Sequence, residues 1–286
     1  MKLSIIIVSW KVKAKLAANL RAIFGENCGL DLEVFVVDNN SGDGTVEMVK
    51  NNFPQVNLIA NLENLGFAKA NNQALQRATG DYILLLNPDM QVKPDTLAQL
   101  MAWAQNNPQA WITGCKLVDG QGEIIKQVRQ FPALGDQLAI ALKLPHLFPK
   151  ILDKYLLKNF DYNKASRVDS IRGSFFLITK KCLAEVGWLD ERFFVWLEEV
   201  DYCRRVYAKG GEVWYTPVAE AIDYVGQSFS QVANFKKQQI FKASQIKYWQ
   251  KWHPGIGVLA LKLAWAISLP LTRLFMALGL KNRSQT

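Results

Sequence analysis

Residues 32–45 read LEVFVVDNNSGDGT, an apolar run that stops at an aspartate and continues as a polar, glycine-containing turn. Consecutive apolar residues that include several valines predict a β-strand covered on both faces. The next residues, VEMVKNNF, resume helical periodicity. A strand, a turn and a helix in this order begin a βαβ unit, which favours a parallel sheet.

The same alternation extends in both directions along the chain. Residues 3–9 (LSIIIVS) predict a strand before this stretch, and residues 56–61 (VNLIAN) and 81–86 (DYILLL) predict two strands after it. Helical segments lie between these runs. The alternation predicts an α/β fold with helices on both faces of the sheet. Ligands of such sheets bind at the carboxyl ends of the strands.

The pattern changes farther along the chain. Residues 116–125 (KLVDGQGEII) predict a hairpin. We interpret residues 133–165, which are apolar and basic and interrupted by prolines, as a mobile helical insertion. Further strands are expected at 173–181 and 212–217, with a helix between them.

Asp38 begins a polar cluster that ends at Thr45. A carboxylate at a strand end can accept hydrogen bonds from a ribose or a base edge, as in dinucleotide-binding folds. The alternative interpretation is a turn that caps the next helix, with Asp43 or Thr45 as the N-cap residue. The chain contains neither a GxGxxG fingerprint nor a GxxxxGK[ST] phosphate loop, so neither of those nucleotide-binding motifs is available.

Asn87-Pro88-Asp89 follows the strand predicted at 81–86. Hard divalent cations take carboxylate and phosphate oxygens as ligands, so a short acidic loop can hold a metal against a diphosphate. The alternative is a simple turn, which Asn-Pro and Pro-Asp favour in any case. Its position beside Asp38 at the carboxyl edge of the sheet favours the functional interpretation.

Glu198-Glu199-Val200-Asp201 opens a predicted helix. Carboxylates at this position are stabilised by the helix macrodipole, which is one explanation for them. Adjacent carboxylates also raise one another's pKa, which suits a general base. The segment by itself supports both interpretations.

The composition excludes several other classes of protein. Half of the 286 residues are hydrophobic and 21% are charged, which is typical of a packed globular body. Four dispersed cysteines and two histidines argue against a disulfide framework, a zinc site or a multi-histidine centre, and favour a reducing compartment. The part of the chain up to Asp223 is electrically neutral, unlike a fold built to bind nucleic acid.

The three polar clusters, in this order and spacing, resemble a known family. The chain resembles an inverting family-2 glycosyltransferase with the GT-A fold, and within that family the rhamnosyltransferase-like bacterial members. The resemblance covers roughly residues 3–228. It rests on SIIIVSW (4–10), VVDNNSGDGT (36–45), NLENLGFAKANNQAL (61–75), GDYILLLNPD (80–89), GSFFLITKK (173–181) and LDERFFVWLEEVDYCRR (189–205). It implies an α/β fold with a Rossmann-like mixed sheet.

The resemblance also implies which residues bind the nucleotide-sugar donor. Ser9 and Asp38 would line the nucleotide pocket, and Gly66 and Asn71 would lie near the nucleotide-sugar. Asn87 would contribute to the same binding site.

The metal and the catalytic base follow from the same resemblance. Asp89 stands in the family's DxD-type motif and would ligate Mg²⁺ or Mn²⁺ on the diphosphate. Glu198 and Glu199 occupy the catalytic Glu-Asp position, so Glu199 would deprotonate the acceptor hydroxyl. The reaction would be a single in-line displacement with inversion at the anomeric carbon.

Three residues or pairs depart from the family pattern. Trp10-Lys11 replaces an aromatic-Asn pair, and Glu199 replaces the commoner Asp. Asp223 stands where the family usually has a His that binds metal or phosphate. Asp223 could serve a hard cation equally well, because Mg²⁺ prefers oxygen ligands. The substitution is also compatible with altered metal use or lost activity.

The C-terminal segment, residues 229–286, differs in character from the rest. Nine of the 34 Lys and Arg follow Asp223, whereas none of the 25 Asp and Glu does. We expect a basic amphipathic helix at 229–255 and a second, more apolar helix at 256–280, kinked at Pro270 and lying in a membrane interface with Trp265 as an anchor. Anionic lipid attracts each such cation by about 1 kcal/mol.

Two other interpretations of this segment are open. It could pack on the body and leave its Lys and Arg in water, although a solvated face usually mixes both signs of charge. It could also bind nucleic acid, but its Leu and Ile content is too high for a phosphate-tracking arm, so no nucleic-acid partner is expected.

Together these features predict a GT-A domain over 1–228 and a cationic helical tail over 229–286. The predicted function is transfer of a sugar from a nucleotide-diphosphate donor, of the dTDP-rhamnose type, to a lipid-linked or polysaccharide acceptor. The protein would lie on the cytoplasmic face of the cell membrane. Alternatives are a degenerate protein that binds nucleotide-sugar or glycan without turnover, and a membrane-surface scaffold of a polysaccharide assembly complex. The sequence indicates no oligomeric state.

Overall fold

The computed structural model describes residues 1–25, 29–224 and 232–277, without the side chains of residues 271 and 274–277. The strands of the main sheet are β1 (Lys2–Ser9), β2 (Asp31–Asp38), β3 (Asn57–Ala60), β4 (Tyr82–Leu86), β5 (Met90–Val92), β6 (Ala110–Val118), β8 (Ser166–Arg167), β10 (Phe175–Thr179) and β11 (Glu212–Asp223). Strands β7 (Val128–Arg129) and β9 (Ser170–Ile171) form a separate pair.

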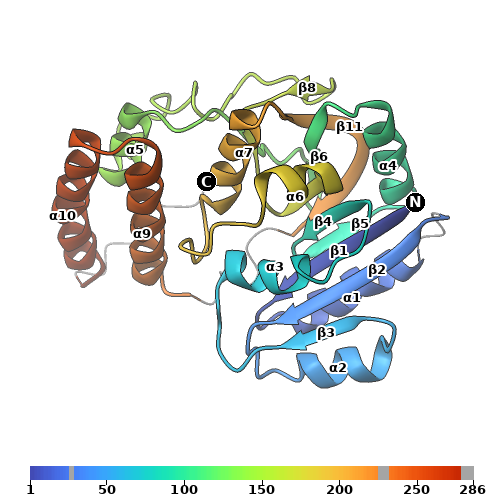
Figure 1. The fold of residues 1–286 in the computed structure, drawn as a ribbon. Helices are drawn as coiled ribbons and strands as arrows, with labels where there is room; N and C mark the ends of the chain where they lie inside the picture. The colour runs from blue at the N-terminus through green and yellow to red at the C-terminus, as the bar shows by residue number, and fades with distance from the viewer. Residues whose placement is uncertain (26–28, 225–231, 278–286) are drawn as a thin grey trace.

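The helices are α1 (Lys13–Gly25), α2 (Thr45–Asn52), α3 (Phe67–Leu75), α4 (Thr96–Asn106), α5 (Leu134–Ala141), α6 (Lys180–Val186), α7 (Glu198–Ala208), α9 (Asn234–Trp252) and α10 (Ile256–Ala277), with a short 3₁₀ helix η1 (Leu144–His146). Helices α9 and α10 lie side by side at one end of the molecule (Figure 1).

The main sheet has the strand order β3-β2-β1-β4-β10-β6-β11-β5, with β8 paired to β11. Neighbouring strands from β3 to β4 are parallel, as the alternation of strands and helices predicts. Strand β10 is antiparallel to β4 and β6, and β5 is antiparallel to β11. The sheet is therefore mixed, and Figure 1 shows helices on both of its faces.

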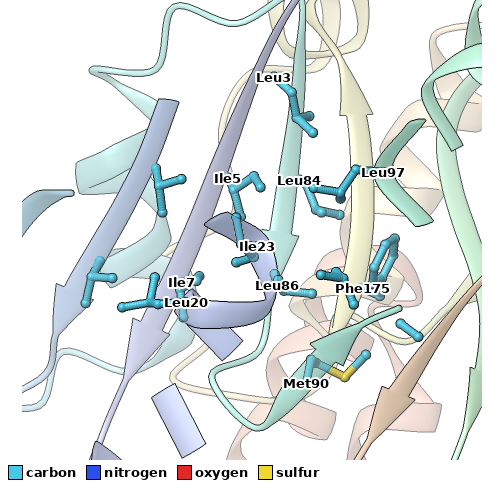
Figure 2. Packing of buried hydrophobic residues seen from close by; sticks show 14 of the residues in the cluster. Leu3, Ile5, Ile7, Leu20, Ile23, Leu84, Leu86, Met90, Leu97 and Phe175 are labelled. Carbon is cyan, nitrogen blue, oxygen red and sulfur yellow. The ribbon is translucent and has the colours of Figure 1, made fainter. Parts of the chain in front are cut away.

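The core lies on the two faces of this sheet because successive side chains of a strand point in opposite directions. Leu3, Ile5 and Ile7 of β1 belong to one buried cluster, and Ile6 belongs to the other. Figure 2 shows the first cluster, in which Leu20 and Ile23 of α1 pack against β1. Burial on both faces explains why the strands near the middle of the sheet read as unbroken apolar runs.

The parallel register aligns the ends of β1 and β2. Ser9 lies opposite Asp38, and Asp38 in turn lies opposite Ala60 of β3. The first residues after β1, β2 and β4 therefore meet at one edge of the sheet, as the sequence predicts.

Two predictions for the middle of the chain have mixed outcomes. The hairpin at 116–125 is confirmed, since the Asp119 amide donates to the Glu123 carbonyl and the Ile125 amide to the Leu117 carbonyl, both at 2.9 Å. The segment 133–165 is helical only in α5 and η1, and turns make up most of the remainder. Prolines at 145 and 149 account for the break in the helix.

The C-terminal helices pack on the body of the protein. Tyr248 and Trp249 of α9 and Leu261 of α10 are buried in a cluster with Leu197 and Val200. Trp265 is 3% exposed, and its indole N–H donates to Gln245 Oε1 at 2.5 Å. The expectation that Trp265 anchors in a membrane is therefore wrong, because this side chain fills the contact between α9, α10 and α5.

Pro270 lies inside α10, where the sequence predicts a kink. The boundary expected between residues 228 and 229 lies outside the described residues, as does Cys28. Among the described residues, each helix is too short or too polar to cross a membrane.

Candidate active site

A pocket of about 500 Å³ opens at the carboxyl edge of the sheet. Its walls are formed by the ends of β1, β2 and β4, the start of α3, the segment from Arg172 to Ser174, and the start of α7 with the residues before it. The first residues of α9 form a further wall. Of the site residues expected from the sequence, the pocket is lined by Gly66, Asn87, Asp89, Glu198 and Glu199.

The Asp38 loop combines both interpretations of its sequence. Asp43 Oδ1 accepts from the Thr45 amide at 3.1 Å, so this part of the loop orders the start of α2. Asp38 Oδ2 accepts from the Ser41 amide at 3.0 Å. Asp38 Oδ1 and the Ser9 hydroxyl are buried and have no hydrogen-bond partner among the described residues. Buried polar atoms normally have partners, so these two atoms are suited to accept or donate to a ligand.

Gly66 is required by a close approach between two loops. Its φ is 81°, and a Cβ atom there would lie 2.3 Å from the Phe194 carbonyl oxygen. The Phe67 amide donates to this same oxygen at 2.6 Å. Asn39, which also lines the pocket, donates to the Gly66 carbonyl at 3.0 Å. The loop before α3 is thereby fixed to the loop before α7.

Asn71 has a different environment from the one expected. It lies within α3, is 1% exposed and donates to the Phe67 carbonyl at 2.9 Å. It is absent from the residues that line the pocket. Its visible contact is with the backbone of the first turn of α3, beside Gly66.

Asn87-Pro88-Asp89 joins β4 to β5 and is held from two sides. The Asn87 amide donates to the Ser174 carbonyl at 2.9 Å, and Asn19 of α1 donates to the Asn87 carbonyl at 2.9 Å. The Tyr224 amide donates to the Asp89 carbonyl at 3.2 Å. Backbone contacts therefore set the position of Asp89, whose side chain is almost fully buried.

Asp223 lies close to Asp89, on the strand that neighbours β5. It is the last residue of β11 and pairs with Met90 of β5, one residue beyond Asp89. Its carboxylate lies 3.7 Å from a guanidinium nitrogen of Arg172, a residue of the pocket wall. The segments that carry Asp89 and Asp223 are thus adjacent.

These residues fit a hard divalent cation in part. Two buried carboxylates supply oxygen ligands of the kind that Mg²⁺ and Mn²⁺ prefer. Within the described residues, no group of three or more His, Cys, Asp or Glu side chains is placed to hold a metal. Further ligands would have to come from water or from a diphosphate, as is common for Mg²⁺.

Glu198 and Glu199 are the first residues of α7. Trp196 and Leu197 before them have φ values of 69° and 70°, a left-handed conformation that is costly for residues other than glycine. Such strain persists where the surrounding structure imposes it, commonly at functional sites. It turns the chain sharply into α7, so that both glutamates reach the pocket.

The electrostatics of the two glutamates suit proton transfer. Burial raises the pKa of Glu198 well above its ordinary value, and the Glu199 carboxylate raises it further. Burial also raises the pKa of Glu199, against the opposing effect of the Arg172 guanidinium. Glu198 Oε2 has no hydrogen-bond partner in the described part of the chain. A carboxylate with a raised pKa is a stronger base than an exposed one.

Asp201, the third carboxylate of this segment, has a structural environment. It is fully buried, and its carboxylate contacts Arg205 at 3.0 Å and Lys251 at 2.7 Å. Trp252 of α9 donates to Asp201 Oδ1 at 2.7 Å. Asp201 therefore ties α7 to the end of α9.

Helix α9 supplies a wall that the sequence analysis missed. Lys236 and Ile240 line the pocket together with Trp196. Trp196 also packs edge-on against Phe241, with ring centroids 6.1 Å apart. Arg172 and Phe194 are further lining residues that the sequence did not single out, and Asn39 belongs to the polar cluster that Asp38 begins. Arg172 and Phe194 lie inside or next to quoted motifs, but only the folded chain brings them to the pocket.

The comparison with known proteins gives the family. Residues 4–180 match the sequence model of glycosyl transferase family 2, which is more than half of the chain. The chain belongs to glycosyl transferase family 2. The fold agrees, since its mixed α/β sheet matches those of GT-A enzymes. The chain is therefore a GT-A glycosyltransferase of family 2.

Two curated relatives are rhamnosyltransferases. The N-acetylglucosaminyl-diphospho-decaprenol L-rhamnosyltransferase of Mycobacterium tuberculosis is 26% identical over 238 residues, which cover 76% of each chain. The rhamnosyltransferase WbbL of Escherichia coli is 29% identical over 167 residues, covering 56% of this chain and 61% of that protein.

Two solved structures share the fold at low sequence identity. The mannosyltransferase PcManGT of Pyrobaculum calidifontis, in complex with GDP-Man and Mn²⁺, is 17% identical with a TM-score of 0.59, covering 98% of this chain and 81% of that one. GalNAc-T7 with UDP, GalNAc and Mn²⁺ is 14% identical with a TM-score of 0.58, covering 86% and 48%. These structures were determined with a divalent metal.

Proposed function

We propose that this glycosyltransferase moves a deoxyhexose of the rhamnose type from a nucleoside-diphosphate donor to a lipid-linked or polysaccharide acceptor, with inversion. The observation that carries the mechanism is the pair Glu198-Glu199, which lines the same pocket as Asn87-Pro88-Asp89 and has raised pKa values. The rhamnosyltransferase relatives support the choice of sugar.

The donor would lie against the carboxyl edge of the sheet. The partnerless Ser9 hydroxyl and Asp38 Oδ1 are available to the nucleoside, and Gly66, which lines the pocket, would lie beside the sugar-phosphate. Asn71 is assigned an indirect part, because it contacts the backbone of the Gly66–Phe67 turn region. Asn87 and Asp89 would face the diphosphate.

Asp89 and Asp223 would hold Mg²⁺ or Mn²⁺ against the donor diphosphate. The bound cation would offset negative charge on the departing nucleoside diphosphate. Arg172, which lies beside Asp223, adds a fixed positive charge to the same region. An oxygen ligand from Asp223 in the position of the family's usual His is chemically suitable for these cations.

Glu199 would act as the general base. Its carboxylate would take the proton of the acceptor hydroxyl while that oxygen attacks the anomeric carbon and the bond from this carbon to the diphosphate oxygen breaks. A single displacement of this kind inverts the anomeric configuration. Glu198 is more deeply buried, and as a protonated group beside Glu199 it would position the base.

The acceptor would approach along the wall formed by Trp196 and α9. A lipid-linked acceptor requires the protein to work at a membrane surface, and we place it peripherally on the cytoplasmic face, attached through residues 229–286. The excess of Lys and Arg in that segment supports this placement.

The experiment is a transfer assay on the full chain with labelled nucleotide-sugars, including dTDP-rhamnose, with Mn²⁺ and membrane lipid extract. Wild-type protein should form product, and Glu199→Gln should lower kcat by about 100-fold or more. Glu185→Gln, which alters an exposed carboxylate of α6, is the matched control and should retain activity. Absence of transfer with every donor, or full activity of Glu199→Gln, would sink the proposal.

Asp223 in place of the usual His also favours a second candidate, a protein that binds nucleotide-sugar without turnover. Calorimetry with nucleoside diphosphates and Mn²⁺ separates the two functions. Binding without product in the transfer assay would support the non-catalytic protein. A membrane scaffold predicts that no nucleotide binds at all.

A further inference from the structure

The outer face of α10 carries a stripe of exposed apolar side chains. Ile256, Leu259, Leu263 and Ile267 are 85%, 56%, 56% and 59% exposed. At about 100° per residue, these four positions fall within an arc of about 80° on the helix. The opposite face is occupied, because Leu261, Ala264 and Trp265 are buried against the body.

A second exposed apolar segment follows α5 and lies next to α10. Beyond α5, Leu147, Phe148 and Ile151 are 74%, 59% and 41% exposed. Ala141 at the end of α5 packs against Ala264 and Trp265 of α10. Lys143 Nζ donates to Thr272 Oγ1, which attaches the start of this segment to the last turns of α10. The insertion and α10 are therefore neighbours.

These two segments account for most of the large apolar side chains that the described residues expose. Leu142 also belongs to the second segment, so eight of the fourteen such side chains lie within 142–151 and 256–267. Soluble monomers rarely expose apolar surface in one place to this extent, and such patches commonly mark an interaction site. We call one set of ten exposed side chains the apolar–basic face. It consists of Leu147, Phe148, Ile151, Ile256, Leu259, Leu263, Ile267, Lys150, Lys262 and Arg273.

The charge on this face is of one sign. Lys150 lies between Phe148 and Ile151, and Lys262 and Arg273 are exposed on α10. Lys262 and Arg273 project to the same edge of the apolar stripe, about 50° from Leu259. Residues 137–152 and 256–286 contain no Asp or Glu. A surface that combines exposed apolar groups with cations complements an anionic lipid headgroup layer over acyl chains.

We infer that the apolar–basic face, built jointly by the 142–151 insertion and the outer side of α10, docks on an anionic membrane surface. The docking element is thus a composite of two chain segments. Trp265 takes no part in it, since the inner side of α10 is committed to the body. In this arrangement α10 lies on the bilayer surface, in agreement with its cationic edge. No helix in the described residues is long and apolar enough to cross a membrane.

This placement brings the pocket close to the lipid. Helix α9 lines the pocket through Lys236 and Ile240, and its Phe241 contacts Trp265 of α10 with ring centroids 6.3 Å apart. Packed helices lie about 10 Å apart, so one helix separates the pocket wall from the docking helix. A sugar carried on a membrane lipid is then within reach. Only this last step rests on the proposed function.

The test is flotation of the full chain with vesicles of phosphatidylcholine alone or with about 30% phosphatidylglycerol, a composition chosen to supply the anionic charge to which basic residues respond. Wild-type protein should float with the anionic vesicles, and less so at high salt. The double variants Leu147→Gln/Phe148→Gln and Leu263→Gln/Ile267→Gln should each lower the partition coefficient about tenfold or more. Leu62→Gln, at an apolar residue that is 95% exposed elsewhere, is the matched control and should bind normally.

The double variant Lys150→Gln/Lys262→Gln should weaken binding to anionic vesicles by about tenfold or more and leave the residual binding to neutral vesicles unchanged. Unchanged thermal unfolding of every variant confirms that the exposed substitutions leave the fold intact. The inference is overturned if wild-type protein ignores anionic vesicles or if both apolar variants bind normally. It is also overturned if the apolar variants bind vesicles normally but change a dimer into a monomer. The apolar–basic face would then be an interface between two copies of this chain. Because no donor is present, these results leave the transferase proposal untouched.

Discussion

The sheet edge and helix α9 both wall the pocket, but they are held in place by different interactions. At the sheet edge, strand register and backbone hydrogen bonds set the positions of Asp38, Asn87 and Asp89. Helix α9 is instead attached by side chains, through one apolar cluster and the buried carboxylate of Asp201. The position of the sheet side of the pocket therefore follows from the strand topology, whereas the position of the helical side depends on a few specific side-chain contacts.

Asp201→Ala should have the largest effect on this comparison. It removes the buried carboxylate to which Trp252 Nε1 and Arg205 Nε donate, and one of the two carboxylates that Lys251 contacts. Breaking a buried ion pair costs about 3–5 kcal/mol, so we expect a loss of about 3 kcal/mol in the free energy of unfolding. Urea denaturation measures it. Asp161→Asn, at an exposed carboxylate that contacts Lys164, should leave the midpoint unchanged.

Gly66→Ala tests the sheet side of the pocket. The added Cβ would lie 2.3 Å from the Phe194 carbonyl and would push apart the loops before α3 and α7. A displacement of about 1 Å in a catalytic site can cost about 100-fold in kcat/KM, which is the loss we expect in the transfer assay. Gly42→Ala also places alanine at positive φ, but its Cβ would meet no atom within 4 Å. If both variants lose activity equally, backbone strain rather than the Phe194 contact is responsible.

Trp265→Phe should have a smaller effect, confined to the helix pair. It keeps most of the apolar contact and leaves Gln245 Oε1 without its donor, in a site where Gln245 is fully buried. An unpaired buried polar group costs about 1–3 kcal/mol, so the free energy of unfolding should fall within this range. Nucleotide binding measured by calorimetry should stay the same. A loss of nucleotide binding would contradict the separation of the two walls.

Glu198→Gln should change the pH dependence of stability with no loss of packing. Because the folded-state pKa of Glu198 is raised, the native protein binds its proton more tightly than the unfolded chain. The resulting stabilisation is complete below the unfolded pKa and is lost as the pH rises through the folded value. The Gln variant should therefore be more stable than wild type at high pH and equal to it in acid. Thermal unfolding of both proteins across a pH series measures this difference. If the melting temperatures of the two proteins change with pH in the same way, the prediction is contradicted.

The sequence predicts the sheet side of this comparison well. Apolar runs place β1 and β2 to within about a residue, because burial on both faces leaves little choice of residue at those positions. The parallel direction of the first four strands and the convergence of their polar ends also follow. The antiparallel course of β10 does not follow, because an apolar strand such as 173–181 carries no mark of its direction.

The sequence predicts the helical side less well. Helix α10 begins at residue 256 as expected, whereas α9 is shorter than the expected 229–255, and the packing of both on the body depends on residues far away in the chain, such as Val200 and Leu134. Arg172 and Phe194 were missed because their place in the pocket depends on the meeting of separate loops. The absence of carboxylates after Asp223 favours a prediction that Trp265 anchors in a membrane. In the structure, however, helix α10 buries the face that carries Trp265 and exposes the opposite face.

The buried Gln245 amide has a consequence for how this protein can be divided. It donates to Gln137 of α5 at 2.8 Å and accepts from Trp265 of α10, so a single side chain connects the two C-terminal helices to a helix about 100 residues earlier in the chain. A shortened chain that ends at residue 228 would uncover Tyr248's neighbours in the apolar cluster, Leu197 and Val200, directly beside the two glutamates. Transplanting the C-terminal helices onto another transferase would likewise fail without α5. For protein engineering, the C-terminal helices and α5 therefore have to be treated as one unit.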